Sequence, residues 1–194
     1  RREGIETIVA LRGDKPKDVE VLPPGQRDFG YARDLVAFIR ERGNFNIAVA
    51  GYPESHPEAP NRDADLLHLK EKVAAGGDWI VTQLFFDNKD YFDFVGRCRA
   101  AGIKVPIVPG IMPVTGFAQL KRFTSMCGAK LPAGLVAELE PIQDRPEAVI
   151  RYGIDYATRQ CRELLAGGAP GVHFYTLNRS HSTSEILQNL RRGS

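Results

Sequence analysis

Five short apolar segments recur along the chain, and polar side chains collect at the C-terminal end of each one. They span residues 7–14, 46–52, 79–86, 105–111 and 172–179. Short apolar runs bounded by turn residues are typical of strands buried in a parallel sheet. We therefore predict five buried strands whose C-terminal ends carry chemistry.

Helical patterns separate these segments. Apolar residues recur at spacings of three and four residues, and glycines often follow where each pattern stops. The predicted helices cover residues 30–42, about 63–75, 88–101, from 115 onward, 131–142, 146–166 and from 182 onward. Ser182-Thr183-Ser184-Glu185 fits a capping box at the start of the last one. Strand and helix thus alternate as consecutive β-α units.

Two architectures fit such a pattern. A doubly wound sheet should carry a glycine-rich first turn or a phosphate loop, and neither G-x-G-x-x-G nor G-x-x-x-x-G-K-[ST] occurs. A (β/α)8 TIM barrel instead distributes active groups over the C-terminal ends of many strands, as here. We predict an α/β fold of this barrel type, incomplete, with about five of the eight β-α units. The first three units are expected upstream of residue 1.

Composition narrows the function classes. The 194 residues are 43% hydrophobic, which is enough for one domain core. The 26 basic and 24 acidic residues give a net charge of +2 and are scattered, so we expect no nucleic-acid partner. No apolar run is long enough to span a membrane, and we expect no membrane partner. Because the chain starts without methionine, we expect a piece of a longer protein.

Cysteine usage points to a reducing compartment. Cys98, Cys127 and Cys161 are odd in number and form no C-x-x-C pair, which argues against a disulfide framework and a zinc site. We therefore expect a cytoplasmic protein without a metal.

The ends of the first two strands offer candidate ligand contacts. Arg12 and Asp14 flank Gly13, either as a ligand-facing turn or as a surface turn with a local ion pair. Tyr52, Glu54 and His56 could serve ring stacking, hydrogen bonding or acid-base work, although a histidine beside prolines is often structural. A metal is disfavoured because no H-E-x-x-H motif occurs.

The remaining candidates also allow two interpretations each. Gln83 resembles an amide that recognises a substrate, or a satisfied core glutamine. Lys72 could reach a phosphate or be solvated. Tyr175, Asn178 and Arg179 could bind an anionic group or cap the sheet edge.

No arrangement typical of nucleophilic catalysis is legible. Neither a Ser-His-Asp nor a Cys-His pattern occurs, and Phe123 sits at a spacing typical of core residues. Spacing alone therefore predicts a barrel-like enzyme with a broad polar opening.

Taken together, the motifs resemble the methylenetetrahydrofolate reductase family, flavoproteins that make 5-methyltetrahydrofolate. The matching stretches run in order along nearly the whole chain. They are Leu-Arg-Gly-Asp at 11–14, Tyr-Pro-Glu at 52–54 with His-Pro-Glu-Ala at 56–59, Ala-Asp-Leu-Leu at 64–67, Thr-Gln at 82–83 with Phe-Phe-Asp at 85–87, Pro-Gly-Ile-Met-Pro-Val at 109–114, and His-Phe-Tyr-Thr-Leu-Asn-Arg at 173–179.

The resemblance implies a barrel that binds FAD at the C-terminal ends of its strands, with this chain supplying the fourth to eighth. The residues implied to line the flavin are Arg12, Gly13, Asp14, Tyr31, Ala32, Ala50, Tyr52, His56, Ala59, Asp65, His68, Glu71 and Lys72. Those implied to face the folate substrate or the nicotinamide are Asp14, Gln83, Gln119, Phe123, Leu177 and Arg179. His68 and Glu71 differ from the residue types typical of the family.

The implied reaction is the reduction of 5,10-methylenetetrahydrofolate by NAD(P)H, with hydride transfer through FAD in ping-pong order. The resemblance assigns catalytic roles to Asp14, Gln83 and Phe123. The amide of Gln83 suits both the nicotinamide and the pterin edge, and Phe123 can stack on either ring. Asp14 would favour a cationic iminium. We also expect the full-length protein to be a homo-oligomer.

One part of the family pattern lies outside the chain. The general acid of the family, a glutamate near the first barrel strand, is expected before Arg1. We therefore predict that this chain alone is inactive and binds FAD weakly. The alternatives are a non-catalytic barrel with a regulatory or assembly role, and a flavin-free lyase or aldolase. The latter usually needs a lysine at a strand end, which none of the five strands has.

Overall fold

The computed structural model describes residues 3–13 and 29–192, and within them the strands are parallel. One sheet has the order β1-β2-β3-β4, so each strand pairs with its neighbour in the sequence. Its strands are β1 (Thr7–Ala10), β2 (Asn46–Gly51), β3 (Trp79–Thr82) and β4 (Ile107–Val108). A second sheet pairs β5 (Gly110–Ile111) with β6 (His173–Phe174).

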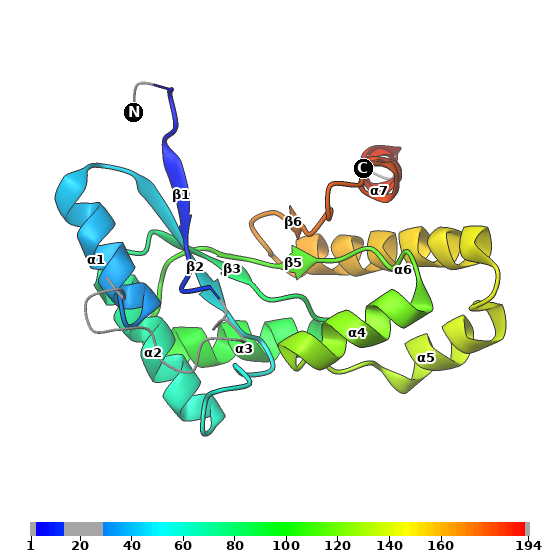
Figure 1. The fold of residues 1–194 in the computed structure, drawn as a ribbon, viewed down its shortest axis with the longest axis horizontal. Helices are drawn as coiled ribbons and strands as arrows, with labels where there is room; N and C mark the ends of the chain where they lie inside the picture. Colours follow the sequence, from blue (N-terminus) through cyan, green and yellow to red (C-terminus); the bar gives the residue numbers. More distant parts are fainter. Residues whose placement is uncertain (1–2, 14–28, 193–194) are drawn as a thin grey trace, which may run out of the picture.

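Helices follow the strands and cover the sheets (Figure 1). Their bounds are α1 (Ala32–Arg42), α2 (Arg62–Ala74), α3 (Asn88–Ala100), α4 (Phe117–Cys127), α5 (Ala133–Leu139) with the 3-10 turn η1 (Glu140–Ile142), α6 (Pro146–Ala166) and α7 (His181–Arg192). α1 packs on α2, and α6 packs on both α3 and α7. The alternation of parallel strands and helices confirms the predicted α/β class.

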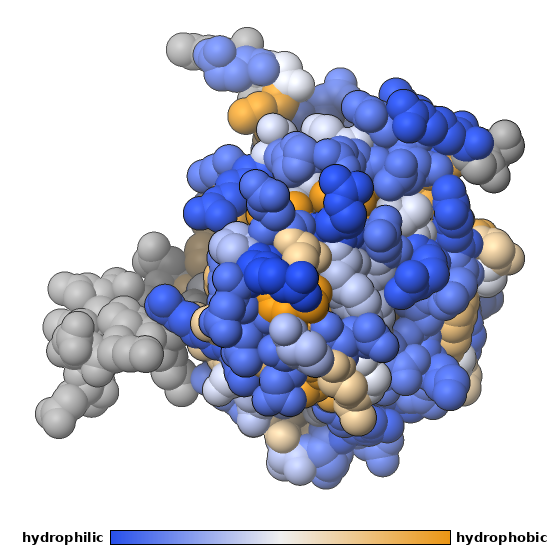
Figure 2. All heavy atoms as spheres, turned by 90° about the vertical axis from the view of Figure 1, so that its right-hand side faces the viewer, coloured by the Kyte–Doolittle hydropathy of each residue, from blue (hydrophilic) through white to orange (hydrophobic). Residues whose placement is uncertain are grey.

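Two apolar clusters hold these layers together. The larger one joins strand residues such as Ile47 and Ile80 to Phe94 of α3, all three at most 2% exposed. The smaller one joins Leu120 of α4 to Leu139 of α5. Full burial of such a side chain contributes about 1.5 to 3 kcal/mol. On the face shown in Figure 2, apolar residues are scattered among hydrophilic ones.

The strands are shorter than predicted. β3 ends at Thr82, so Gln83 lies just beyond the strand and not inside it. The predicted strand at 105–111 is divided between β4 and β5. The break falls at Pro109, which has no N–H to continue a ladder, and the next N–H, that of Gly110, donates to the Thr82 hydroxyl at 2.9 Å. Gly110 then pairs with His173 of β6.

Two further expectations are wrong in detail. β1 is not buried, since Val9 is 47% exposed and β1 pairs, within the described residues, with β2 alone. Among residues 3–13 and 29–192, no strand lies along its outer edge. The capping box at Ser182 is also wrong, because α7 already begins at His181 and Ser182 lies inside its first turn. By contrast, residue type allows either Asp87 or Asn88 to cap α3, and the structure shows that Asp87 does so by accepting the N–H of Lys89.

Candidate functional site

The candidate site lies along one edge of the sheets. Because the strands are parallel, their C-terminal ends point the same way, which is where α/β proteins bind ligands. Arg12 follows β1, Tyr52 follows β2, Gln83 follows β3 and Tyr175 follows β6. Segments far apart in the sequence thus converge on this edge.

A chain of polar contacts links the ends of β1 and β2. Arg12 Nη2 lies 2.8 Å from Glu58 Oε2, and the N–H of Glu58 donates to His56 Nδ1 at 3.0 Å. The N–H of His56 donates to Asp65 at 3.1 Å, and its ring meets Tyr52 edge to face at 4.5 Å. We call these five residues and Lys72 the β2 cluster. Arg12 thus has a long-range partner in Glu58, while the local ion pair considered for it involves Asp14, which lies outside the described residues.

His56 has a defined protonation preference. Burial lowers the pKa of His56, and the nearby Arg12 and Lys72 charges act in the same direction, while Asp65 and Glu58 oppose them. Because its Nδ1 accepts a hydrogen bond, the neutral ring carries its proton on Nε2. This histidine is therefore a neutral donor at neutral pH.

Lys72 is the partly buried cation of the β2 cluster. Its ammonium donates to the carbonyl of Ala50 at 2.5 Å. Burial lowers the pKa of Lys72 to about 8, and the Asp65 carboxylate partly offsets this. An ammonium has three donors, so it can bind further acceptors. The solvated interpretation of Lys72 is wrong.

A second group extends the β2 cluster across α1 and α2. Arg33 Nη1 lies 2.6 Å from Glu71 Oε2, and His68 Nδ1 lies 3.3 Å from the same oxygen. These contacts with His68 and Arg33 lower the pKa of Glu71. The ring of Tyr31 stacks near that of His68 at 6.4 Å. Arg33 was not predicted, because its partner is 38 residues away.

The end of β3 carries Gln83 half-buried. The side-chain oxygen of Gln83 accepts the N–H of Leu84 at 2.9 Å. The backbone N–H of Gln83 donates to the carbonyl of Gly51. Within the described residues its amide nitrogen has no recorded partner. Gln83 is therefore not a fully satisfied core amide, and it keeps donors for a ligand.

Tyr175 joins β3 to a pocket beside α7. Its hydroxyl donates to the carbonyl of Thr82 at 2.8 Å, and burial raises the pKa of Tyr175 to about 12. The pocket is small and partly open to solvent, with a cavity volume of about 20 Å³. Its lining is Pro113, Thr115, Gln119, Tyr175, Thr176, Leu177, Arg179, Ser182 and Thr183. We call it the α7 pocket.

The α7 pocket gathers three of the residues that the motifs single out. Gln119 accepts a hydrogen bond from Thr115 at 3.0 Å, while Leu177 and Arg179 come from the turn after β6. Leu177 has a φ of 49° and Asn178 a φ of 59°, a left-handed pair that reverses the chain there. Four further lining residues were not named as site residues from the sequence: Thr115, Thr176, Ser182 and Thr183. Thr176 lies in the matched stretch 173–179, and Ser182 and Thr183 lie in the stretch interpreted as a helix cap.

The other candidates occupy positions between or around these two groups. Phe123 is half-buried on α4 and packs against the smaller apolar cluster. Gly13 is exposed with a φ of 75°. Ala32 begins α1, Ala50 lies in β2 and Ala59 lies in the loop after it. Asp14 lies outside the described residues.

Two kinds of feature are absent from the described residues. No group of three or more His, Cys, Asp or Glu side chains there has a geometry suited to a metal ion. No helix in that part of the chain is both long and apolar enough to cross a bilayer.

Comparison with known proteins gives consistent results. The family model described as "Methylenetetrahydrofolate reductase" matches residues 1–191. The chain is 45% identical over 201 residues to Methylenetetrahydrofolate reductase (NADH) 1 of Arabidopsis thaliana, covering 98% of this chain and 34% of that protein. It is 43% identical over 188 residues to 5,10-methylenetetrahydrofolate reductase of Escherichia coli (strain K12), covering 96% and 61%. The chain therefore spans about a third of the plant relative's length.

A solved structure shares the fold. It is an uncharacterized protein from Clostridium thermocellum, described as binding two copies of 5-methyl-5,6,7,8-tetrahydrofolic acid. This structure superposes on the present chain with a TM-score of 0.57. The match covers 84% of this chain and 59% of that one at 17% identity, so it bears on the fold alone.

Proposed function

Because the chain belongs to the methylenetetrahydrofolate reductase family, we propose that it forms the C-terminal part of a barrel that reduces 5,10-methylenetetrahydrofolate to 5-methyltetrahydrofolate with NAD(P)H and FAD. The observation that carries the proposal is that residues far apart in the sequence converge at the C-terminal ends of the strands. Residues from four of the stretches that match the family, at the ends of β1, β2, β3 and β6, lie along one edge of the parallel sheets.

The β2 cluster has the chemistry that FAD requires of a binding site. A flavin dinucleotide presents two phosphates, hydroxyls and flat rings. Lys72 offers a desolvated ammonium with donors to spare, Arg12 adds a guanidinium, and Tyr52 and His56 present rings. Such a dry cation binds a phosphate more strongly than a solvated one, because charges interact more strongly at low dielectric.

The group formed by Tyr31, Arg33, His68 and Glu71 would hold the far end of the dinucleotide. Tyr31 and His68 supply flat surfaces, and Arg33 keeps Glu71 ionised at neutral pH. An ionised carboxylate accepts hydrogen bonds from hydroxyls or an amino group. FAD, when bound, supplies the hydride acceptor and donor that protein side chains lack.

The α7 pocket would take the substrate side. Arg179 is exposed, and no ion pair of its side chain is recorded within the described residues, so it is available to a carboxylate. Gln119 adds an amide, and Leu177 an apolar surface. This combination suits a ligand with a ring system and an acidic tail, as folate has.

Gln83 stands between the two regions and would orient either reactant in turn. Its free amide donors can bind the carboxamide of a nicotinamide or the edge of a pterin. Phe123 on α4 would stack on the ring that occupies the site. Asp14, next to Gly13, would favour positive charge that develops on the folate. Each of these residues binds or orients, and none forms a covalent bond.

The rest of the barrel would come from a preceding segment. The outer edge of β1 pairs with no strand in the part of the chain that the structure describes, and Ile5, Val9 and Leu11 are exposed there. A further parallel strand would pair at this edge. Three such units would complete a (β/α)8 barrel and supply the general acid. The free cysteines suit a cytoplasmic protein, and we propose a homo-oligomer for the full natural chain.

The test compares this 194-residue chain with the full natural chain that carries it. Both are purified and assayed for bound flavin and for NAD(P)H-dependent formation of 5-methyltetrahydrofolate. The proposal predicts flavin and turnover in the full chain, and weak flavin binding without turnover in the isolated one. A full chain that holds flavin without turnover would favour a regulatory barrel instead.

A further inference from the structure

The loop after β2 is tied to a turn that comes more than 70 residues later. This loop, residues 52–61, carries Tyr52 and His56 of the β2 cluster. Its Glu54 accepts the N–H of Lys130, in the turn between α4 and α5, at 2.8 Å through Oε2. α4 carries Gln119 and Phe123. One carboxylate therefore joins the loop of the β2 cluster to the helix on the substrate side.

The second oxygen of Glu54 indicates that stability alone does not explain a glutamate at this position. Glu54 Oε1 is buried and has no hydrogen-bond partner within the described residues. An unpaired buried acceptor costs about 1 to 3 kcal/mol, so a glutamate chosen for stability alone would be a poor choice here. Burial raises the pKa of Glu54, as does the nearby Asp90, while the Lys130 N–H and the charge of Arg62 oppose the rise.

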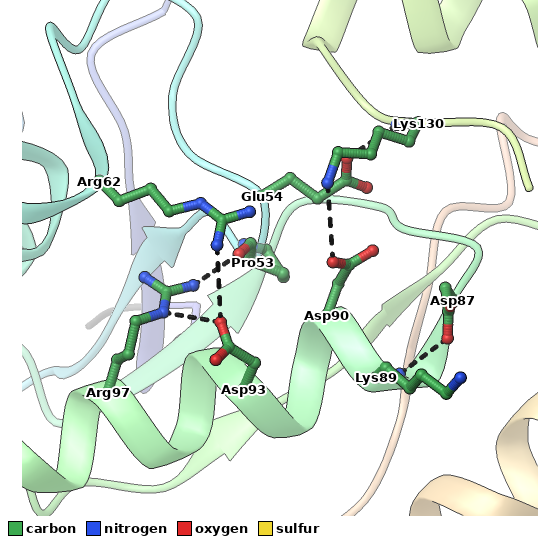
Figure 3. A network of polar contacts seen from close by, with 9 residues as sticks. All are labelled: Pro53, Glu54, Arg62, Asp87, Lys89, Asp90, Asp93, Arg97 and Lys130. Carbon is green, nitrogen blue, oxygen red and sulfur yellow. Dashed lines mark hydrogen bonds and ion pairs between the residues drawn. The ribbon is translucent and has the colours of Figure 1, made fainter.

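Charged residues of α3 surround the contact (Figure 3). Lys130 Nζ lies 3.9 Å from Asp90, and Arg97 Nε lies 2.8 Å from Asp93. Arg97 also donates to the carbonyl of Pro53 at 2.8 Å, directly before Glu54. The loop is thus held from α3 at Pro53 and from the α4–α5 turn at Glu54.

A second contact joins the same two segments. Gly128 has a φ of 72°, and a Cβ atom at this position would lie 3.1 Å from Pro57 Cγ. The turn after α4 therefore lies directly against the loop. Ser55, between Glu54 and His56, has a φ of 107°, a conformation that persists only when surrounding contacts enforce it.

We propose that Glu54 is a positioning residue that fixes the loop of the β2 cluster to α4, so that the cofactor and substrate sides of the site keep one spacing. The proposal rests on the proposed function for the meaning of the two sides. Glu54 touches neither ligand in this account. The length of the Glu54 side chain matters, because it places one oxygen within hydrogen-bond distance of the Lys130 N–H. The charge of the carboxylate is less important.

The experiment, done in the full natural chain, separates the effect of the length of the Glu54 side chain from the effect of its charge. Glu54→Gln keeps an acceptor at the same distance and removes the charge, whereas Glu54→Asp keeps the charge and shortens the side chain by one methylene. Glu54→Ala removes both. Glu138→Ala, at an exposed glutamate of α5, is the matched control. Two readouts are taken: hydrogen exchange of the Lys130 amide, and KM for folate per bound flavin.

We expect the Lys130 amide to exchange about tenfold faster in Glu54→Ala and Glu54→Asp, because one hydrogen bond is lost. We expect KM for folate to rise roughly fivefold in both, with an unchanged flavin absorbance per protein. Glu54→Gln should lie within about twofold of wild type in both readouts. If Glu54→Ala does not accumulate, Glu54→Asp still carries the comparison.

Two results would overturn the inference. One is an unchanged Lys130 exchange rate in Glu54→Asp; the other is a Glu54→Gln variant as impaired as Glu54→Asp, which would make the charge decisive. A wild-type chain without flavin or folate reduction would instead count against the proposed function. The exchange readout does not depend on activity, so the two failures are distinguishable.

Discussion

Replacing Lys72 by methionine should stabilise the cofactor-free protein and weaken FAD binding at the same time. Burial lowers the pKa of Lys72 from 10.5 to about 8. A shift of about 2.5 pH units corresponds, at 1.36 kcal/mol each, to about 3 kcal/mol of instability at neutral pH. Methionine has a similar unbranched shape and no charge to desolvate.

The net gain in stability is smaller than this cost. Losing the hydrogen bond to the Ala50 carbonyl costs about 1 kcal/mol, which leaves about 2 kcal/mol in favour of Lys72→Met. Such a change raises Tm by roughly 4 °C or more in a protein of this size. The loss of a charged hydrogen bond to phosphate, about 1.5 to 3 kcal/mol, should raise the FAD Kd about 10- to 100-fold.

Both effects have a defined pH dependence. The pKa of Lys72 is lower in the folded than in the unfolded state, so between about pH 8 and 10.5 the unfolded state binds more protons. Wild-type apoprotein should therefore gain stability as pH rises through that window, and Lys72→Met should not. Because the protonated amine binds phosphate, the wild-type Kd for FAD should rise by up to about tenfold per pH unit above pH 8, until it reaches the level of Lys72→Met.

Thermal unfolding of the apoprotein and FAD titration by fluorescence quenching measure the two effects. Lys70→Met, at an exposed lysine of the same helix, is the control and should change neither quantity appreciably. A Lys72→Met variant with lower apoprotein Tm and an unaltered FAD Kd would refute the reasoning. So would a Lys70→Met variant that behaves in the same way as Lys72→Met.

Three other substitutions test separate parts of the account. Arg179→Ala should raise KM for folate roughly tenfold in steady-state assays without lowering the flavin content, and a loss of flavin would contradict its place in the α7 pocket. Asp14→Asn should abolish most folate reduction with a smaller effect on flavin retention, as measured by activity per bound flavin. Gly153→Ala should lower the free energy of unfolding in urea by about 3 kcal/mol, because its Cβ would overlap the carbonyl of Val114. Gly96→Ala, which meets open space on α3, should instead add about 0.5 to 1 kcal/mol, and equal effects of the two would argue against the packing described.

The helices could be predicted closely from sequence because their signal is local. Periodic apolar residues and a cap such as Asp87 act within a few residues, and α3 begins where predicted. The strand ends were less predictable. The Thr82 hydroxyl accepts the N–H of Gly110, a contact between residues 28 positions apart that no local pattern encodes.

The site shows the same division. Residue type and position in the sequence identified Lys72 and Gln83 as candidates. For each of the two residues, however, the sequence left two interpretations open. The hydrogen bond to the Ala50 carbonyl shows that the Lys72 ammonium has a partner inside the protein. The hydrogen bond from the Leu84 N–H shows that the oxygen of the Gln83 side chain is occupied. Arg33 was missed altogether, because its meaning depends on Glu71 in another helix.

The most direct test of the central claim is the visible absorption spectrum of the full natural chain under anaerobic conditions. We expect flavin bands in the purified protein that bleach on addition of NADH or NADPH and return on addition of 5,10-methylenetetrahydrofolate. A colourless protein that takes up no FAD, or flavin bands that stay bleached after the folate is added, would contradict the account.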